Sequence, residues 1–364
     1  MISLDSRQTD VPADVPILER LNMVRLVVVL LCGLGYASTM AIGPGAREWL
    51  NLFGYDPSLY GIQVLFFISG WLAWRSLESG RGVRAFIASR ARRVLPWVAL
   101  YTLIVVAVLY PVLCDHDAAR LKSSLELGAY FLKTLTLIQP GQPMPGALDN
   151  ALYACELQGT IWTLRWGAIA FVGLLALHAL RIRQRWVYGT IFLALLAAHV
   201  GANVYTDRSG SAVLEPVIPG LRLAFPFILG VIVRQNARHL PGSAKGWGMI
   251  ALVALGAAAS HYSLLPWSYA IEPLAMIGWG ALAMSVLHSR SALVANWPAI
   301  VVPVYLGAWP IAQTWLFAHP DITVPALVVT TLATTVALAL AFRLAAAALA
   351  DRVAGRIHGR VQPA

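Results

Sequence analysis

Ten apolar runs of about 17–25 residues follow one another along the chain, separated by short polar segments. A helix of that length crosses a hydrocarbon core of about 30 Å. The pattern therefore predicts an all-α integral membrane protein with about ten transmembrane helices in one bundle. The predicted spans lie near 22–42, 59–78, 94–114, 160–180, 186–204, 218–234, 247–265, 268–287, 298–317 and 324–347.

Prolines interrupt two of these runs without ending them. Pro226 falls inside 218–234, and Pro303 and Pro310 fall inside 298–317. Membrane helices tolerate proline where neighbours satisfy the freed carbonyls, so we expect kinked helices there. The polar ends predict a cytoplasmic tail over 1–21 and another over 348–364. A transmembrane domain over 22–347 connects them.

The composition supports the membrane assignment and explains the positive charge. Of 364 residues, 59% are hydrophobic and 12% are charged, against about 25% charged in a soluble domain. The net charge of +10 would suggest nucleic acid in a soluble chain. Here the arginines lie between apolar runs, so topology explains them and we expect no nucleic-acid partner.

The placement of lysine and arginine predicts the orientation. With the N-terminus inside, twenty of these residues fall in inside segments and five in outside loops. Arg165 and Arg222 are left over, within predicted spans. Positive residues accumulate on the cytoplasmic side of membrane proteins, so this bias predicts both termini in the cytoplasm and an even number of spans.

Six short segments resemble elements of one membrane-enzyme family. The first is the run 22–42, with Arg25 followed eleven residues later by Tyr36. The others are VLFFISGWL at 64–72, FIASRARRVLP at 86–96, GTIWTLR at 159–165, FPFILGV at 225–231 and VYLGAWPIAQ at 304–313. Their order and spacing resemble the acyltransferase-3 family of bacterial O-acyltransferases along nearly the whole chain.

The resemblance implies a function and a location. A member of this family is expected to take an acyl group from acyl-CoA, most often acetyl-CoA, and to deliver it to a hydroxyl of a surface or lipid-linked glycan. The expected location is the bacterial cytoplasmic (inner) membrane, crossed many times. Guanidinium groups bind phosphate in a bidentate manner. Arg25, Arg90 and Arg93, the latter two in the second inside loop, therefore become the expected binding residues for the phosphates of acyl-CoA.

Two positions depart from the family pattern. The family histidine of the first span is Tyr36 here, and the glutamate that commonly follows the WTL element is Gly167. A tyrosine hydroxyl, with an ordinary pKa of about 10, is a poor general base, and glycine has no side chain to orient one. These changes indicate an altered or lost activity, so no catalytic residue is assigned.

Other polar residues in or near the spans are candidates to line a substrate cavity. Trp162 and Arg165 belong to the WTL element, while Arg222 and Glu272 lie within later spans. An ionisable residue within a membrane is a functional candidate by default. We expect Glu272 to pair with either Arg165 or Arg222. His178 and His199 are expected to be hydrogen-bonded packing residues.

The cysteines and histidines indicate no metal site, because no set has ligand spacing. Cys114 and Cys155 flank the long external loop and are candidates to pair in an oxidising compartment. Two functions of different classes therefore remain: an acyl-CoA-dependent O-acyltransferase with an altered base, or an inactive relative. The inactive relative would bind a donor or glycan and serve polysaccharide assembly or export proteins. A transporter is less consistent with the sequence, which shows no paired broken helices.

Overall fold

The computed structural model describes residues 15–43, 48, 50–80, 82–113, 124–144, 147–148, 151–264, 269–289 and 300–359. These residues form an all-α bundle, with an isolated bridge between Leu52 and Tyr55. The helices are α1 (Val15–Ile42), α2 (Pro57–Glu78), α3 (Val83–Ile104), α4 (Tyr110–Leu113), α5 (Ser124–Leu135), α6 (Trp162–Ala179), α7 (Arg185–Ser209), α8 (Ile218–Gln235), α9 (Ala244–Leu264), α10 (Ile271–His288), α11 (Val301–Ala318) and α12 (Val324–Gly359).

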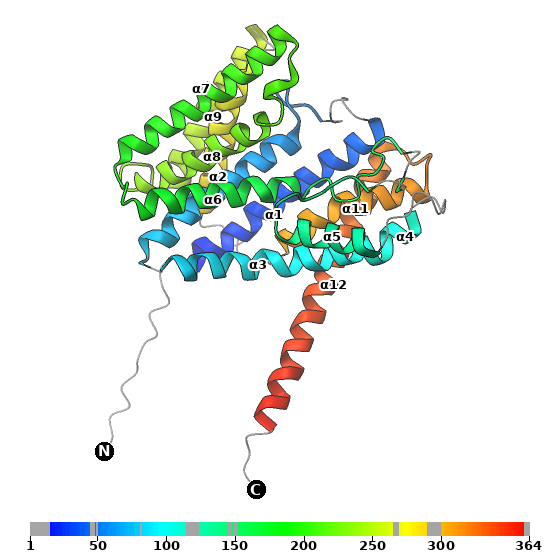
Figure 1. Ribbon diagram of the computed structural model, residues 1–364. Coiled ribbons are helices and arrows are strands. Elements are labelled where there is room, and N and C mark those ends of the chain that lie inside the picture. The colour runs from blue at the N-terminus through cyan, green and yellow to red at the C-terminus, as the bar shows by residue number, and fades with distance from the viewer. Residues whose placement is uncertain are drawn as a thin grey trace, which may run out of the picture.

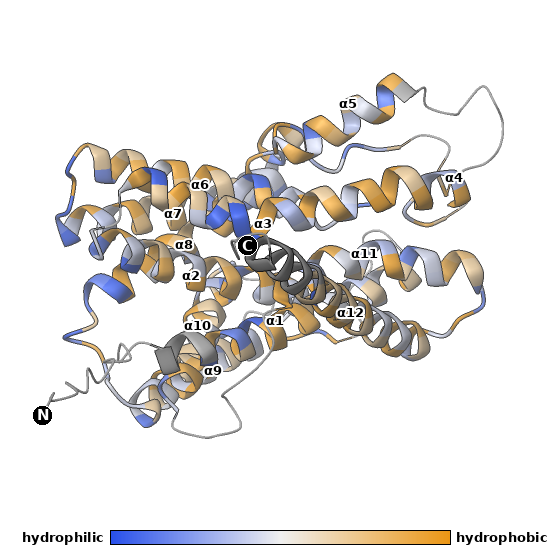
Figure 2. Ribbon diagram, turned by 90° about the horizontal axis from the view of Figure 1, so that it is seen from below, coloured by the Kyte–Doolittle hydropathy of each residue, from blue (hydrophilic) through white to orange (hydrophobic). Residues whose placement is uncertain are grey.

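Ten of these helices correspond to the ten predicted spans, and nine are long and apolar enough to cross a membrane, counted over the described residues. The exception is α2, which has the length but not the hydropathy because it carries polar and amphipathic residues along its whole length. Figure 2 shows apolar residues along most of the other helices. Large apolar side chains on α9, such as Met249, Leu252 and Val253, are about 70% exposed, as expected of a surface that lipid covers.

The largest helix contacts are those of α9 with α10, of α8 with α2 and α7, and of α11 with α1. In Figure 1, α7, α8 and α9 lie on one side, while α3, α5 and α11 lie on the other. Helices α1, α10 and α11 are 56%, 61% and 56% buried over their most apolar windows, whereas α6 and α9 are 11% and 17% buried. Helix α12 packs on α1 and α11, and its C-terminal part extends away from the bundle (Figure 1).

Helix α2 lies at the centre, between α1, α8 and α10. Its contact with α8 depends on two glycines. A Cβ atom at Gly70 would lie 1.9 Å from the Phe227 carbonyl oxygen, and one at Gly230 would lie 2.0 Å from that of Phe67. Small residues of this kind let membrane helices approach backbone to backbone. The central position of α2 explains why its residues are largely buried despite their polarity.

The prolines are accommodated within helices, as the sequence predicts. Helix α8 continues through Pro226 and α11 through Pro310. Helix α3 continues through Pro96 and then widens into a π-helical turn over Val105–Leu109 before α4. Pro111, in α4, has no N–H to donate to the preceding turn. Just before it, the Tyr110 N–H donates to the Val105 carbonyl oxygen, five residues earlier, which is the bonding of a π turn.

Four boundaries or segments differ from the sequence-based expectation. Helix α12 continues to Gly359, into the predicted C-terminal tail. Helix α1 begins at Val15, seven residues before the predicted span, because helical structure continues into the polar flank. Helix α3 begins at Val83, so Arg90 and Arg93 lie on a helix and not in a loop. The long external segment contains α5, an amphipathic helix too short to span a membrane.

Polar contacts mark one end of the bundle. Where α1 begins, Arg20 Nη1 donates to the Leu287 carbonyl oxygen at the end of α10, over 3.4 Å. Where α2 ends, Arg234 Nε contacts Glu78 Oε2 at 2.7 Å. We call this the arginine-rich end, and the end where α1 finishes and α2 starts the opposite end.

Candidate functional site

Three arginines lie close together at the arginine-rich end. Arg25 is half-buried on α1, and its guanidinium is within electrostatic range of Arg93 and Arg90 on α3. Among the described residues, no carboxylate forms an ion pair with any of the three. Three guanidinium groups gathered without an acid form a surface that attracts anions.

Arg90 is held in place by aromatic rings. Its guanidinium carbon lies 3.5 Å from the ring centre of Phe86 and 4.9 Å from that of Phe171. Its Nη1 also donates to the Phe86 carbonyl oxygen over 3.3 Å. Stacking of this kind fixes the plane of a guanidinium while leaving most of its N–H groups free to bind. Arg90 is therefore pre-organised toward a ligand at this end.

Tyr36 lies in a buried network of hydroxyl groups. Its hydroxyl is 3.3 Å from that of Tyr305 on α11, which is 2.8 Å from Thr163 Oγ1 on α6. Thr163 in turn donates to the Thr160 carbonyl oxygen over 3.0 Å. Each hydroxyl can therefore donate to the next, and the series ends at a carbonyl that does not titrate. This network provides hydrogen bonds but no base.

Aromatic rings close the space around Tyr36. The Trp309 ring packs edge-on at 5.6 Å between centres, and Tyr153 packs on the far side of Trp309 at 5.3 Å. Trp309 Nε1 donates to the Glu156 carbonyl oxygen over 2.9 Å, which ties α11 to the segment before α6. Tyr36 itself is 8% exposed. Its side chain thus fills the position that the family resemblance gives to a histidine.

Gly167 lies one helical turn from Thr163 on the same face of α6. A Cβ atom there would meet Phe66 of α2 at 3.8 Å, an ordinary contact distance. A side chain at this position would therefore project toward α2, beside the hydroxyl network. Tyr36 and Gly167 are thus connected only indirectly, through Tyr305 and Thr163.

Glu272 forms a second buried polar cluster on the other side of α2. Its Oε1 is 3.0 Å from Arg222 Nε and also accepts a hydrogen bond from Gln63 Nε2. Its Oε2 is 3.1 Å from His199 Nε2. Glu272 and His199 are fully buried, whereas the Arg222 side chain is 24% exposed. Of the two partners considered for Glu272, the structure selects Arg222.

The surroundings of His199 define its tautomer. Asn203 Nδ2 lies 3.3 Å from His199 Nδ1, so Nδ1 accepts and Nε2 carries the proton that faces Glu272. Glu272 therefore accepts hydrogen bonds from α2 and α7, and its charge is balanced by the ion pair with Arg222 of α8. Such a carboxylate is stabilised as the anion without full hydration. The sequence indicated neither this histidine–glutamate pair nor its position, because the two residues are 73 positions apart.

Arg165 and Trp162 lie away from this cluster. Arg165 is exposed and lines a shallow depression of about 390 Å³ with apolar residues of α6 and of the turn after α5. Trp162 packs against the largest hydrophobic cluster. The four predicted cavity residues therefore do not line one cavity: Arg222 and Glu272 meet, and the other two lie elsewhere.

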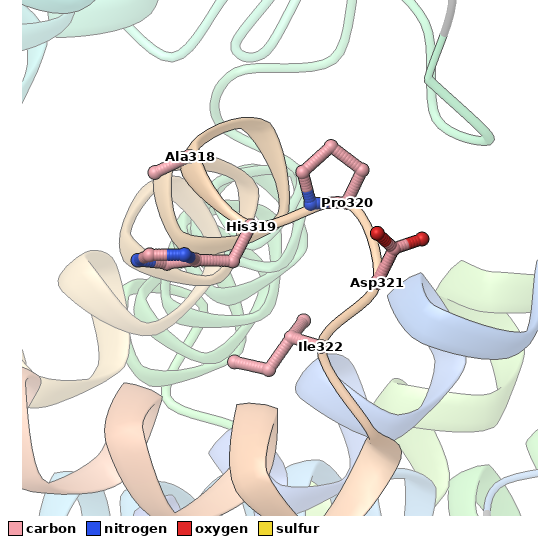
Figure 3. A pocket seen from close by; sticks show the side chains of 5 residues that line it. All are labelled: Ala318, His319, Pro320, Asp321 and Ile322. Carbon is pink, nitrogen blue, oxygen red and sulfur yellow. The ribbon is translucent and has the colours of Figure 1, made fainter.

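The other depression, of about 440 Å³, follows the turn between α11 and α12. Figure 3 shows that the side chains of His319 and Asp321 point in different directions there, so they form no acid–base pair. His319 instead stacks on Trp315 with ring centres 5.6 Å apart. This depression is formed by a surface turn.

Metal ligation and cysteine pairing add no further site. In the part of the chain that the structure describes, no group of three or more His, Cys, Asp or Glu residues is arranged to hold a metal ion. Cys114 lies outside the described residues, so its pairing with Cys155 stays a prediction. Comparison with protein-family models, curated proteins and solved structures finds no match for this chain.

Proposed function

We propose that this membrane protein binds acyl-CoA at its arginine-rich end and transfers the acyl group to a glycan hydroxyl near the opposite end. The acyl group of the proposal is acetyl, and the acceptor is a surface or lipid-linked glycan of a bacterial envelope. The proposed location is the inner membrane, with the arginine-rich end in the cytoplasm. The observation that carries the proposal is the group formed by Arg25, Arg90 and Arg93.

The chemistry of the donor suits that group. Coenzyme A carries several phosphates, and arginine binds phosphate through paired, charge-assisted hydrogen bonds. The three guanidinium groups repel one another and have no carboxylate partner among the described residues. An anionic ligand would relieve that repulsion. The aromatic support of Arg90 reduces the entropy that would be lost on binding.

The geometry of α1 connects the donor to the acceptor side. Tyr36 lies eleven residues beyond Arg25 on one continuous helix, which corresponds to about 16 Å along the axis. A thioester at the end of a long, flexible arm can extend along this distance while its phosphates stay at the arginines. The reacting group would then lie near the opposite end, where a glycan hydroxyl can approach.

Binding of coenzyme A to the purified protein tests the donor site. We expect Arg25→Ala and Arg90→Ala to weaken binding by about tenfold or more each, because one charge-assisted contact contributes about 1.5–3 kcal/mol. Arg92→Ala is the matched control, since Arg92 is exposed on the same helix and binds its own backbone at Ala88. We expect this variant to bind coenzyme A like the wild type.

Pantetheine, which lacks the phosphates, separates phosphate recognition from binding of the arm. Its affinity should be low and unchanged in all three variants. Equal losses for coenzyme A in Arg25→Ala and Arg92→Ala, or losses for pantetheine of the same size, would contradict a phosphate site at these residues.

A second candidate function is binding without turnover, as part of envelope polysaccharide assembly or export. It is favoured by the closed hydroxyl network of Tyr36, which contains no base. Labelled acetyl-CoA distinguishes the two functions. Turnover in the wild type would exclude the binding-only function. A lack of turnover that Tyr36→His combined with Gly167→Glu restores would support an inactive relative with an intact donor site.

A further inference from the structure

A buried carboxylate that the sequence did not single out lies against α1 beside Tyr36. Glu48 follows α1 in the chain and is only 4% exposed. It packs on Gly35, the residue before Tyr36, so closely that a Cβ atom at Gly35 would lie 2.2 Å from Glu48 Oε1. Only glycine leaves this space, so α1 is shaped to receive the carboxylate.

The first turn of α2 holds Glu48 from the other side. Ser58 N donates to Glu48 Oε2 over 3.1 Å, and Ser58 Oγ donates to Oε1. The backbone N–H of Glu48 donates to Asp56 Oδ1 over 3.1 Å. These bonds fix the position of the carboxyl group at the positive end of a helix.

The charged and titratable groups around Glu48 come from three segments. Asp56 precedes α2, Cys32 and Tyr36 lie on α1, and Tyr153 precedes α6; each interacts electrostatically with Glu48. Among the described residues, none of the groups that interact with Glu48 is a cation. Burial raises the pKa of Glu48 from 4.5 to about 7, the bonds from Ser58 act in the opposite direction, and the charge of Asp56 adds to the rise. A group that titrates near neutrality can both take and return a proton.

We propose that Glu48 is the base that accepts the proton of the acceptor hydroxyl, in the place of the histidine that the chain lacks. The inference rests on the proposed acyl transfer. Glu48 is the one carboxylate within electrostatic range of Tyr36 among the described residues. Glu48 packs against Gly35. Gly35 lies ten residues beyond Arg25 on α1, about 15 Å along the helix axis. Arg25 and the glycine against which Glu48 packs therefore lie on one helix.

The reaction balances without another reagent. The Glu48 carboxylate takes the proton of the acceptor hydroxyl as the oxygen attacks the thioester carbonyl carbon. A carbon–oxygen bond forms, the carbon–sulfur bond breaks, and the thiolate of coenzyme A leaves. The thiolate then takes the proton back from Glu48. The products are an ester and free coenzyme A, and the carboxylate is restored.

The pH dependence of turnover tests this role in the full-length protein. Thiol release from acetyl-CoA is followed with methyl glucoside as acceptor. Because the active form is the carboxylate, wild-type turnover should rise with pH through about 7. Glu48→Gln should lose about 100-fold or more of the turnover and the pH step, while coenzyme A binding stays unchanged. Glu78→Gln, at the exposed far end of α2, is the control that keeps both.

A second variant displaces the Glu48 carboxylate while leaving glutamate at position 48. Gly35→Ala places a methyl group where Glu48 Oε1 lies, so it should displace the carboxylate and lower turnover as strongly as Glu48→Gln. Gly173→Ala in α6 is the matched control, because a Cβ atom there meets nothing within 4 Å. Unchanged coenzyme A binding in Gly35→Ala shows that the variant is folded.

The outcomes separate this inference from the proposed function. Turnover that survives Glu48→Gln, or that keeps its pH step in that variant, contradicts the role of Glu48 and leaves the acyl transfer standing. A wild-type protein that binds coenzyme A but never consumes the thioester contradicts both. The proposal is supported if Glu48→Gln loses turnover and the pH step while Glu78→Gln keeps both.

Discussion

Glu272 illustrates at the residue scale how burial changes the value of an ion pair. Its carboxylate and Arg222 lie 3.0 Å apart with the glutamate fully buried, whereas the Glu78–Arg234 pair is 37% and 30% exposed at 2.7 Å. Water screens the exposed pair, and holding two long side chains costs entropy. The buried pair cannot lose one partner without leaving the other unpaired in a poorly hydrated site.

We therefore expect Glu272→Gln to destabilise the protein by about 3 kcal/mol or more, and Glu78→Gln by less than about 1 kcal/mol. The partial exposure of Arg222 places the first value at the lower end of the range for buried pairs. The readout is the apparent midpoint of thermal unfolding in detergent, followed by tryptophan fluorescence at a fixed scan rate. Equal shifts of the unfolding midpoint in the two variants would show that the buried cluster stabilises the protein no more than the exposed pair does.

The residue scale is also where sequence reasoning was least complete. The pairing of Glu272 with Arg222 was one of two alternatives, and the participation of His199 was not foreseen. Glu48 lies outside the apolar runs, so no pattern in the sequence points to it. The contacts of Glu272 and His199 depend on the rotation of helices about their axes. A mostly apolar span does not define this rotation, because its faces are alike in hydropathy.

At the scale of elements, the crossing of α2 and α8 depends on glycine. Gly70 and Gly230 each face a carbonyl oxygen of the partner helix at a distance that no Cβ atom tolerates. The contact is backbone to backbone, so no flexible side chain is available to move aside. The two helices must separate or shift if either glycine is replaced.

Gly230→Ala should consequently destabilise the bundle by about 1–3 kcal/mol, the usual cost of overpacking. Gly256→Ala in α9 is its control, because a Cβ atom there meets nothing within 4 Å, and alanine favours a helix over glycine by about 1 kcal/mol. We expect a lower apparent midpoint of unfolding for the first variant and an equal or higher one for the second. A lower midpoint for Gly256→Ala than for Gly230→Ala would show that α2 and α8 do not pack closely at Gly230.

The boundaries of elements were partly predictable. The apolar runs located every long helix, because a backbone in lipid must satisfy its hydrogen bonds within its own segment. The early starts of α1 and α3 were missed, since charged flanks can continue a helix outside the hydrocarbon core. Helix α5 was missed because a short amphipathic segment in a loop has no run long enough to indicate a span.

For the molecule as a whole, α2 determines whether the number of membrane crossings is even or odd. The described residues contain nine helices that are apolar enough to span a membrane, and nine crossings would place the two termini on opposite sides. Counting α2 as a tenth crossing places both on one side. Its 22 residues are about 33 Å long, and it packs against α1, α8 and α10 with Ser58 and Gln63 buried.

Labelling in intact cells with a membrane-impermeant maleimide tests this topology. In a cysteine-free background, Ser209→Cys at the end of α7 should react in intact cells, whereas Ala237→Cys after α8 should react only after permeabilisation. Both positions are exposed, so accessibility within the protein does not explain a difference. The reverse pattern would overturn the orientation predicted from the arginines, and with it the cytoplasmic location of the proposed donor site.

The sequence by itself determined that the chain is an all-helical membrane protein and where its spans lie. This information is local, because each span must be long and apolar enough to satisfy lipid on its own. Only the tertiary structure decided which polar side chains meet. Gln63 and Glu272 are 209 residues apart, and Glu48 reaches Gly35 from a loop. Such contacts are set by the packing of several helices at once, because burying a charge is tolerated only where the whole arrangement provides its partners.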